Sequence, residues 1–303
     1  MDTISRTRTL TYAVAGWAIL YGGLRAVWAA GAAPSFPPFG WDLVGFTGWW
    51  SVPLCAAAGV LAVALYRADT WQPLLAAAAW AVAGALVAAA AILLPELVGL
   101  LLLSPGPHFD PLALASRLAC AGGAVLLGLA TAAYQRRTRG DCPSCCRVGT
   151  PGPRTRRTAF WAAYLAVAGL AARFAAQAVV GFDGLIQDPA IIALEVGMLL
   201  AGGLLPLALV HGWGRIWPRW VPFLAGRTIP RLLLLVPGFG LGAGLVAYFG
   251  MGFVQLASGS DSEFSDAFLV AAMSAYVIWG VALLIAGTDY HLRTRRACAH
   301  CGR

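Results

Sequence analysis

The sequence contains no lysine and no asparagine, and only 11% of its 303 residues are charged. All 21 basic residues are therefore arginines, which give the chain a formal net charge of +8. Without asparagine the chain has no acceptor for N-linked glycans. Because lysine and asparagine have AT-rich codons, whereas alanine, glycine and arginine are abundant here, the composition indicates a high-GC bacterium as the source.

Several enzyme motifs are also missing. The sequence has no Walker A motif, no G-x-S-x-G, no H-E-x-x-H and no histidine pair at the spacing of a haem-bearing span. "GFGLGAG" at 238–244 fits a dinucleotide-binding pattern loosely. It lies inside an apolar segment, however, so close helix packing through small residues is the better interpretation.

Hydrophobic residues make up 60% of the chain, and the mean hydropathy is +0.75. Apolar runs of about 20 residues recur, each long enough to cross a hydrocarbon core of about 30 Å. We therefore expect an all-α integral membrane protein with eight transmembrane helices, at about 10–32, 46–66, 72–94, 111–134, 158–180, 189–211, 231–254 and 267–288. After the third span, "PELVGLLLLSPGPHFDP" is expected to form an interfacial or re-entrant helix rather than a ninth span.

Charge sorts the connections between these spans into two classes. Of the 21 arginines, 18 lie at the N-terminus, near 67–71, 135–157 and 212–231, or in the C-terminal tail. The alternate loops carry seven acids and no arginine. The positive-inside rule then places both termini in the cytoplasm of a bacterial cytoplasmic (inner) membrane. The first span is expected to be retained rather than cleaved as a signal peptide, because its apolar run is long and contains Arg25.

The two halves of the chain resemble each other. "YQRRTRGDCPSC" at 134–145 matches "YHLRTRRACAHC" at 290–301 with an offset of 156 residues (290 − 134), and Asp110 and Asp266 share that offset. Near the start of each half, Arg25 and Arg173 are separated by 148 residues (173 − 25). We expect two parallel four-helix repeats, 1–147 and 148–303, each ending in a cytoplasmic C-x-x-C tail and related by a pseudo-twofold axis along the membrane normal.

The duplicated C-x-x-C pairs provide four thiols on equivalent tails. Thiolates at this spacing from two segments are typical of a tetrahedral structural zinc site, and neighbouring arginines favour the thiolate form. We expect zinc to be bound by four residues: Cys142, Cys145, Cys298 and Cys301. A dithiol redox couple and inert cysteines are the alternatives, whereas a structural disulfide is disfavoured in a reducing cytoplasm. Cys55 and Cys120 lie within spans and are expected to be core residues.

Five ionisable residues fall within the predicted spans or at their outer ends. Counting about 1.5 Å per helical residue places all of them in the outer half of the membrane. They are Arg25, Glu96, Arg117, Arg173 and Glu195. Charges in hydrocarbon are costly unless they are paired or hydrated, and they indicate a functional site by default. One interpretation is structural pairing, Glu96 with Arg117 and Glu195 with Arg173. The other is a net-positive cavity open to the outside, in which arginines bind an oxyanion.

The loop "HGWGRIWPRWVPFLAGRTIPR" at 211–231 alternates tryptophan with arginine and proline. Its tryptophans are expected at headgroup depth and its arginines near anionic lipid. Membrane lipids, rather than nucleic acid, are the partner that this pattern indicates.

The sequence thus favours a transporter or binding protein for a small anionic or lipid-like molecule, with an outward-facing charged cavity at the repeat interface. Two alternatives stay open. One is a membrane-embedded enzyme that acts on a lipid or isoprenoid substrate, or a thiol redox protein. The other is a non-catalytic assembly or immunity factor.

Overall fold

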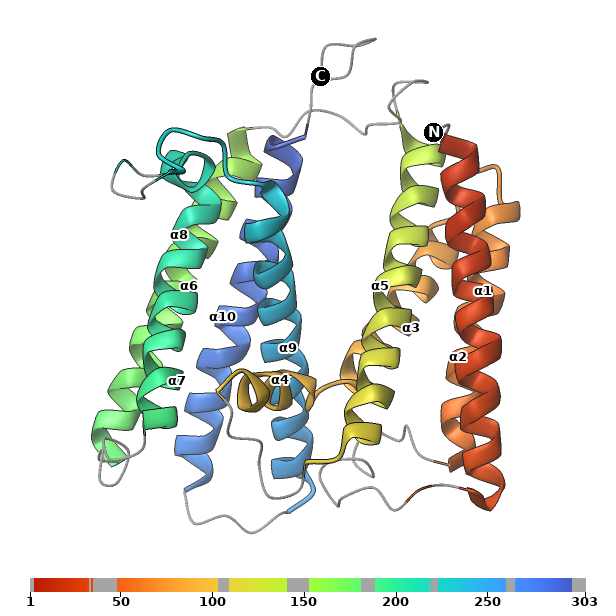
Figure 1. The fold of residues 1–303 in the computed structure, drawn as a ribbon, viewed down its shortest axis with the longest axis horizontal. Helices are drawn as coiled ribbons and strands as arrows, with labels where there is room; N and C mark the ends of the chain where they lie inside the picture. Colours follow the sequence, from red (N-terminus) through yellow and green to blue (C-terminus); the bar gives the residue numbers. More distant parts are fainter. Residues whose placement is uncertain are drawn as a thin grey trace. The chain divides into compact units, whose positions relative to one another are not determined.

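The fold is described by a computed structural model, which places residues 3–32, 34, 48–102, 109–140, 153–180, 189–217, 219, 223–259 and 265–295. The described part is helical and holds no β-strand, only an isolated bridge between Ile216 and Thr228. In chain order the elements are α1 (Thr3–Val27), η1 (Trp28–Ala32), η3 (Gly48–Trp50), α2 (Ser51–Arg67), α3 (Pro73–Ala89), α4 (Leu93–Leu101), α5 (Pro111–Arg139), α6 (Pro153–Val180), α7 (Pro189–Leu199), η4 (Leu200–Leu204), α8 (Leu205–Val210), η5 (Gly212–Arg215), α9 (Arg231–Ala257) and α10 (Asp266–Arg293) (Figure 1).

Seven of the described helices are long and apolar enough to cross a membrane, and the number rises to eight if the bent pair α3 and α4 is one span. This agrees with an all-α membrane protein. The two helices of the bent pair meet at 47°, just after the end of α3 at Ala89. Pro95 lies in the first turn of α4, where a missing N–H leaves no helical hydrogen bond unmade. The segment predicted as an interfacial or re-entrant helix is therefore a separate short helix.

Polar caps fix where two of the long helices begin. The Asp110 carboxylate accepts hydrogen bonds from the backbone N–H groups of Leu112 and Ala113 at the start of α5. The Ser265 hydroxyl accepts one from Phe268 N–H at the start of α10. These contacts satisfy amide groups that would otherwise have no helical partner.

Large apolar side chains point outward from these helices. Ile19, Leu20, Val60, Leu74 and Trp161 are each more than 60% exposed. Only 22–39% of the residues in the most apolar window of each candidate span are buried inside the protein. A soluble protein rarely exposes apolar surface on this scale, whereas lipid tails cover it without penalty.

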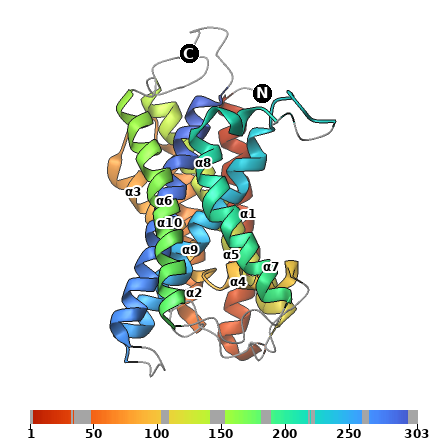
Figure 2. The same ribbon diagram turned by 90° about the vertical axis from the view of Figure 1, so that its left-hand side faces the viewer.

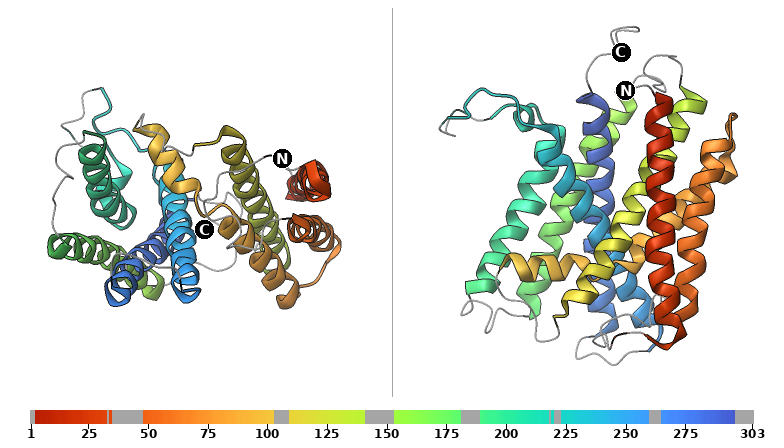
Figure 3. Two further views of the ribbon diagram at one scale, coloured as in Figure 1. Left: turned by 90° about the horizontal axis from the view of Figure 1, so that it is seen from below. Right: turned by 45° about the vertical axis from the view of Figure 1, so that its right-hand side comes forward.

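The chain forms two compact units. The first contains α1, α2, α3 and α5. In this unit α1 packs on α2 and α5, and α3 packs on α5 and α2. Figure 3 shows the antiparallel pair α1 and α2 side by side. Small side chains dominate the buried surface, with Ala58, Ala62, Ala79 and Ala83 among them, so the helix backbones approach closely.

The second unit contains α4 and α6 to α10. Here α6 packs on α8 and α10, and α9 packs on α10 and α8 (Figure 2). In both units the first long helix therefore packs on the second and the fourth, and the third packs on the fourth and the second. Gly242 of α9 faces Gly280 of α10, where an added Cβ at Gly242 would lie 2.9 Å from the Gly280 carbonyl oxygen. This contact confirms close packing through the glycine-rich stretch 238–252.

The fourth long helix of each unit makes matching polar contacts near its C-terminal end. The Tyr134 hydroxyl of α5 donates to Thr70 O and accepts from Gln72 N, each at 2.8 Å, in the connection from α2 to α3. The Tyr290 hydroxyl of α10 donates to Gly214 O at 3.4 Å, in the connection from α8 to α9. Both tyrosines are almost fully buried.

One helical turn after each tyrosine, an arginine of α5 or α10 also binds backbone carbonyl groups of its own unit. Arg137 donates to the carbonyl oxygens of Leu65, Tyr66 and Ala68 at the C-terminal end of α2, at 2.7–3.1 Å. Arg293 donates to Leu209 O at the end of α8, at 3.2 Å. A cation at these carbonyls satisfies helix-end acceptors and complements the helix dipole.

Candidate functional site

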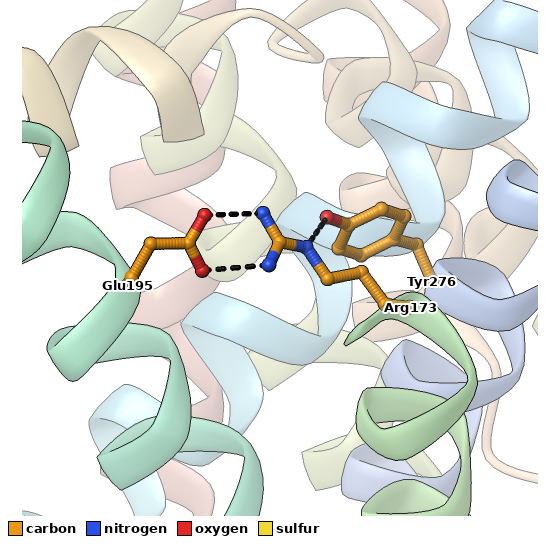
Figure 4. Close-up of polar contacts among 3 residues, drawn as sticks. All are labelled: Arg173, Glu195 and Tyr276. Carbon is orange, nitrogen blue, oxygen red and sulfur yellow. Dashed lines mark hydrogen bonds and ion pairs between the residues drawn. The ribbon is translucent and has the colours of Figure 1, made fainter. Parts of the chain in front are cut away.

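An ion pair inside the second unit joins two of the residues singled out in the sequence. Arg173 of α6 binds the Glu195 carboxylate of α7 through both terminal nitrogens, at 2.6 and 2.5 Å (Figure 4). Its third nitrogen, Nε, donates to the Tyr276 hydroxyl of α10 at 2.9 Å. The side chains of Arg173 and Glu195 are only 12% and 23% exposed. The expected pairing of these two residues is present, and Tyr276 is an addition to it.

Aromatic rings surround this pair. The Arg173 guanidinium lies 4.8 Å from the centre of the Phe174 ring, within the range of a cation–π contact. The Tyr276 ring stacks on Phe249 of α9, with the ring centres 3.9 Å apart. The aromatic packing holds the tyrosine hydroxyl against the guanidinium, so the planar fork of Arg173 is fixed in the orientation that binds a carboxylate with two hydrogen bonds.

The first unit buries two arginines. Arg25 of α1 is 5% exposed and Arg117 of α5 is 3% exposed. The Arg25 guanidinium lies 5.3 Å from the centre of the Trp28 ring. The helices α1, α2, α3 and α5 contain no aspartate or glutamate.

Polar side chains of α1 and α5 meet next to these arginines. The Tyr21 hydroxyl lies 2.7 Å from Ser116 Oγ and 3.3 Å from Cys120 Sγ. Tyr21 is one turn before Arg25, and Ser116 directly precedes Arg117. The two buried cations therefore border a cluster of hydroxyl and thiol groups that donate or accept hydrogen bonds.

The two arginine sites correspond by sequence offset. Arg25 and Arg173 differ by 148 positions, as do Tyr21 and Gly169 (169 − 21). Cys120 and Tyr276 differ by 156 (276 − 120). Each unit thus has a tyrosine hydroxyl between its first and fourth long helices. In the first unit this is Tyr21 of α1, which contacts α5, and in the second unit it is Tyr276 of α10, which contacts α6.

In each unit a tryptophan lies against a glycine of the facing helix. In the first unit Trp17 of α1 covers Gly123 of α5, and its Nε1 donates to Ala119 O at 2.8 Å. In the second unit Trp279, which stands 156 positions after Gly123, belongs to α10 and lies against Gly169 of α6. In both units the tryptophan fills the space beside a glycine of the facing helix. The counterpart of Trp17 at the offset of 148 is Leu165 (165 − 17), so the two tryptophans do not occupy equivalent positions.

Glu96 lies in the first turn of α4 and belongs to the second unit, whereas Arg117 belongs to the first. Their predicted pairing remains a prediction. Of the five candidate residues, the structure brings together Arg173 and Glu195.

The four cysteines predicted to bind zinc, Cys142, Cys145, Cys298 and Cys301, lie outside the described residues. Within the described part of the chain, no three His, Cys, Asp or Glu residues are grouped so as to hold a metal ion. Cys55 and Cys120 are buried free thiols in the first unit, which confirms them as core residues.

Sequence reasoning missed Tyr276, Tyr21 and Ser116. Tyr276 stands 156 positions after Cys120, and Cys120 lies within one turn of Arg117. This offset was therefore a signal in the sequence that Tyr276 lies near a buried arginine. The buried Nε1 of Trp279 has no hydrogen-bond partner in the described structure.

Comparison of the chain with protein-family models, curated proteins and solved structures finds no match. The functional conclusion therefore depends on the geometry of the site.

Proposed function

We propose that the protein is a membrane transporter or binding protein for a small anionic or lipid-like molecule. The oxyanion of this molecule binds at the buried arginines of the first unit, Arg25 and Arg117. The observation that carries the proposal is the bidentate contact of Arg173 with Glu195, at the position equivalent to Arg25. It supports the view that an arginine at this place in the bundle binds a carboxylate.

Two further features support this assignment. The hydroxyl groups of Tyr21 and Ser116, 2.7 Å apart, lie beside the two arginines and give this region polar character. Arginine binds carboxylate and phosphate with matching planar geometry, so both belong to the ligand class.

The proposal includes two parallel four-helix repeats with both termini in the cytoplasm. The shared helix neighbours, the tyrosine pair and the arginine pair all support duplication. With this orientation the buried arginines lie in the outer half of the membrane, so the site opens to the outside. A membrane-impermeant maleimide should label Cys146, the thiol outside the proposed zinc site, only after cells are permeabilised, and labelling of Cys146 in intact cells would contradict the orientation.

Proteoliposomes test the function. Uptake of radiolabelled inorganic phosphate, succinate and oleate is measured with the wild type, with R25Q/R117Q and with R8Q/R67Q. The last variant removes two exposed arginines of the same unit as a matched control. We expect uptake or saturable binding of at least one probe by the wild type and the control, and its loss in R25Q/R117Q. Equal behaviour of all three proteins toward every probe would overturn the proposal.

A structural zinc ion bound by Cys142, Cys145, Cys298 and Cys301 is a second part of the proposal. It is supported by the equivalent contacts that anchor the helix end before each C-x-x-C pair, at Tyr134 and Arg137 and at Tyr290 and Arg293. Elemental analysis of the purified protein should find one zinc per chain. C142S/C298S should lose the metal, while C146S, a substitution of the neighbouring thiol, should retain it. A wild type without zinc would overturn this part and leave the anion site untouched.

A further inference from the structure

The connection between the second and third long helices differs greatly between the two units. Five residues, 68–72, join α2 to α3, whereas 20 residues, 211–230, join α8 to α9. We call the longer connection the arginine hairpin. The Tyr290 hydroxyl contacts Gly214 at its base, as Tyr134 contacts the short connection. The hairpin is thus an addition to an anchor that both units have.

The arginine hairpin has its own backbone pairing. Ile229 N donates to Arg215 O at 2.8 Å, and Trp217 N donates to Arg227 O at 2.9 Å. Gly226 N in turn donates to Trp217 O at 3.1 Å. These bonds bring the two arms together around the bridge between Ile216 and Thr228, so the hairpin has a defined shape in its described part.

Apolar side chains are exposed along the hairpin. Phe223 is 93% exposed and has a backbone φ of 66°, in the left-handed region that non-glycine residues rarely adopt. Trp213, Ile216 and Leu224 are 45%, 51% and 37% exposed. Exposure of a phenylalanine to this degree is unfavourable in water, and an apolar phase that accepts the ring would remove the penalty.

Arginines accompany these apolar residues. Arg215, Arg219, Arg227 and Arg231 lie in or directly after the hairpin, and the chain has no acidic residue between Glu195 and Asp261. Arg219 and Arg227 are exposed. The hairpin therefore presents four positive charges together with aromatic and aliphatic groups, a combination suited to the interface of a bilayer that contains anionic lipid.

We propose that the arginine hairpin binds the headgroups of anionic phospholipids, with Phe223 and Leu224 inserted among the lipids at its tip. Position favours lipid over an acidic protein or nucleic acid. The hairpin connects the ends of two candidate spans, α8 and α9, so it is tethered at both ends to the membrane surface. Charge complementarity then selects anionic over zwitterionic headgroups. The proposal is independent of the ligand bound by Arg25 and Arg117.

Native mass spectrometry of the full-length protein in detergent tests this assignment. Phosphatidylglycerol and phosphatidylcholine are titrated separately, and the fraction of lipid-bound protein is measured for each. The variants are R219Q/R227Q and F223S. The control R8Q/R67Q removes the same charge from the first unit, whose connection is short.

We expect the wild type and R8Q/R67Q to prefer phosphatidylglycerol. Each arginine near a charged surface contributes about fivefold in affinity, so R219Q/R227Q should bind phosphatidylglycerol about 25-fold more weakly. F223S should weaken the binding of both lipids. The proposal is overturned if the wild type shows no preference, or if the control loses as much affinity as R219Q/R227Q. It is also overturned if polyglutamate or duplex DNA, rather than phosphatidylglycerol, binds in a manner that requires Arg219 and Arg227.

Discussion

Arg137 and Arg293 stand 156 residues apart (293 − 137), and each donates hydrogen bonds to backbone carbonyl groups at the C-terminal end of a helix in its own unit. Arg137 binds Leu65 O of α2, and Arg293 binds Leu209 O of α8. The tyrosines one turn earlier, Tyr134 and Tyr290, bind the connection that follows this helix. Such a correspondence of contacts is stronger evidence for duplication than matching letters, because composition alone repeats letters in a chain so rich in alanine, leucine and arginine.

The tyrosine contacts differ in strength, which gives a first prediction. Tyr134→Phe removes two hydrogen bonds of 2.8 Å and leaves Thr70 O and Gln72 N without them. It should lower the free energy of unfolding by about 1–3 kcal/mol. Tyr290→Phe removes one contact of 3.4 Å and should cost about 0.5 kcal/mol. Thermal unfolding in detergent measures both, and an equal loss of stability would contradict the stated geometry.

Asp289 distinguishes the two arginine contacts. Its Oδ2 accepts from Arg293 Nε at 2.5 Å, and its side chain is buried, whereas Ala133 takes the equivalent position in the first unit (289 − 156). Asp289→Ala leaves a largely buried guanidinium without its carboxylate and should destabilise the protein by about 2 kcal/mol. Asp266→Ala, at an exposed position on the same helix, is the control. If Asp289→Ala costs no more than Asp266→Ala in thermal unfolding, the buried pair adds no more stability than an exposed carboxylate in the first turn of a helix.

Two adjacent glycines of α5 allow a test of helix packing. A Cβ at Gly123 would overlap the Trp17 indole, which its hydrogen bond to Ala119 O holds in place, whereas a Cβ at Gly122 would meet nothing within 4 Å. Gly123→Ala should therefore cost about 1–3 kcal/mol through overpacking. Gly122→Ala should be neutral or stabilising by about 0.5 kcal/mol, because alanine is the better helix former. The opposite order of melting temperatures would refute the packing of α1 on α5.

Much of the architecture was predictable because apolar length is a direct signal of membrane crossing. The spans expected at 111–134, 231–254 and 267–288 lie within α5, α9 and α10. The sequence was less informative about which face of each helix is buried. A helix that contacts both protein and lipid is apolar all round, so α6 has no polar stripe to show that Arg173 faces α7 and α10. The ion pair of Arg173 with Glu195 could be predicted from their charges and their depth in the membrane. The contact with Tyr276 could not, because the sequence does not show which face of α10 points toward α6.

The short helix α4 illustrates a second limit of the sequence. Pro95 and the apolar run marked a separate element after the third span. Nothing in the sequence indicated that Leu94 would lie against Gly244 of α9, where a Cβ would come within 3.0 Å of the leucine side chain. Such a contact depends on tertiary packing between segments 150 residues apart (244 − 94).

A double-mutant cycle on Arg173 and Glu195 measures the strength of the internal carboxylate contact. Because the pair is bidentate and mostly shielded from water, R173Q and E195Q should each destabilise the protein, and the double variant by less than the sum. The coupling energy should be about 1–3 kcal/mol. Additive effects in thermal unfolding would show that the two side chains act independently.

Isothermal titration calorimetry with the purified full-length protein tests the central claim that buried arginines of the first unit bind an oxyanion. Inorganic phosphate, succinate and oleate are titrated into the wild type, R8Q/R67Q, R25K/R117K and R25Q/R117Q, after thermal unfolding shows that each variant is folded. We predict that the wild type and R8Q/R67Q bind at least one probe equally, and that R25K/R117K, which retains charge without the planar fork, binds it more weakly. R25Q/R117Q should lose about 100-fold in affinity through two charge-assisted hydrogen bonds. Equal affinity of R25Q/R117Q and the wild type for every probe, or no binding of any probe by the wild type, would contradict the account.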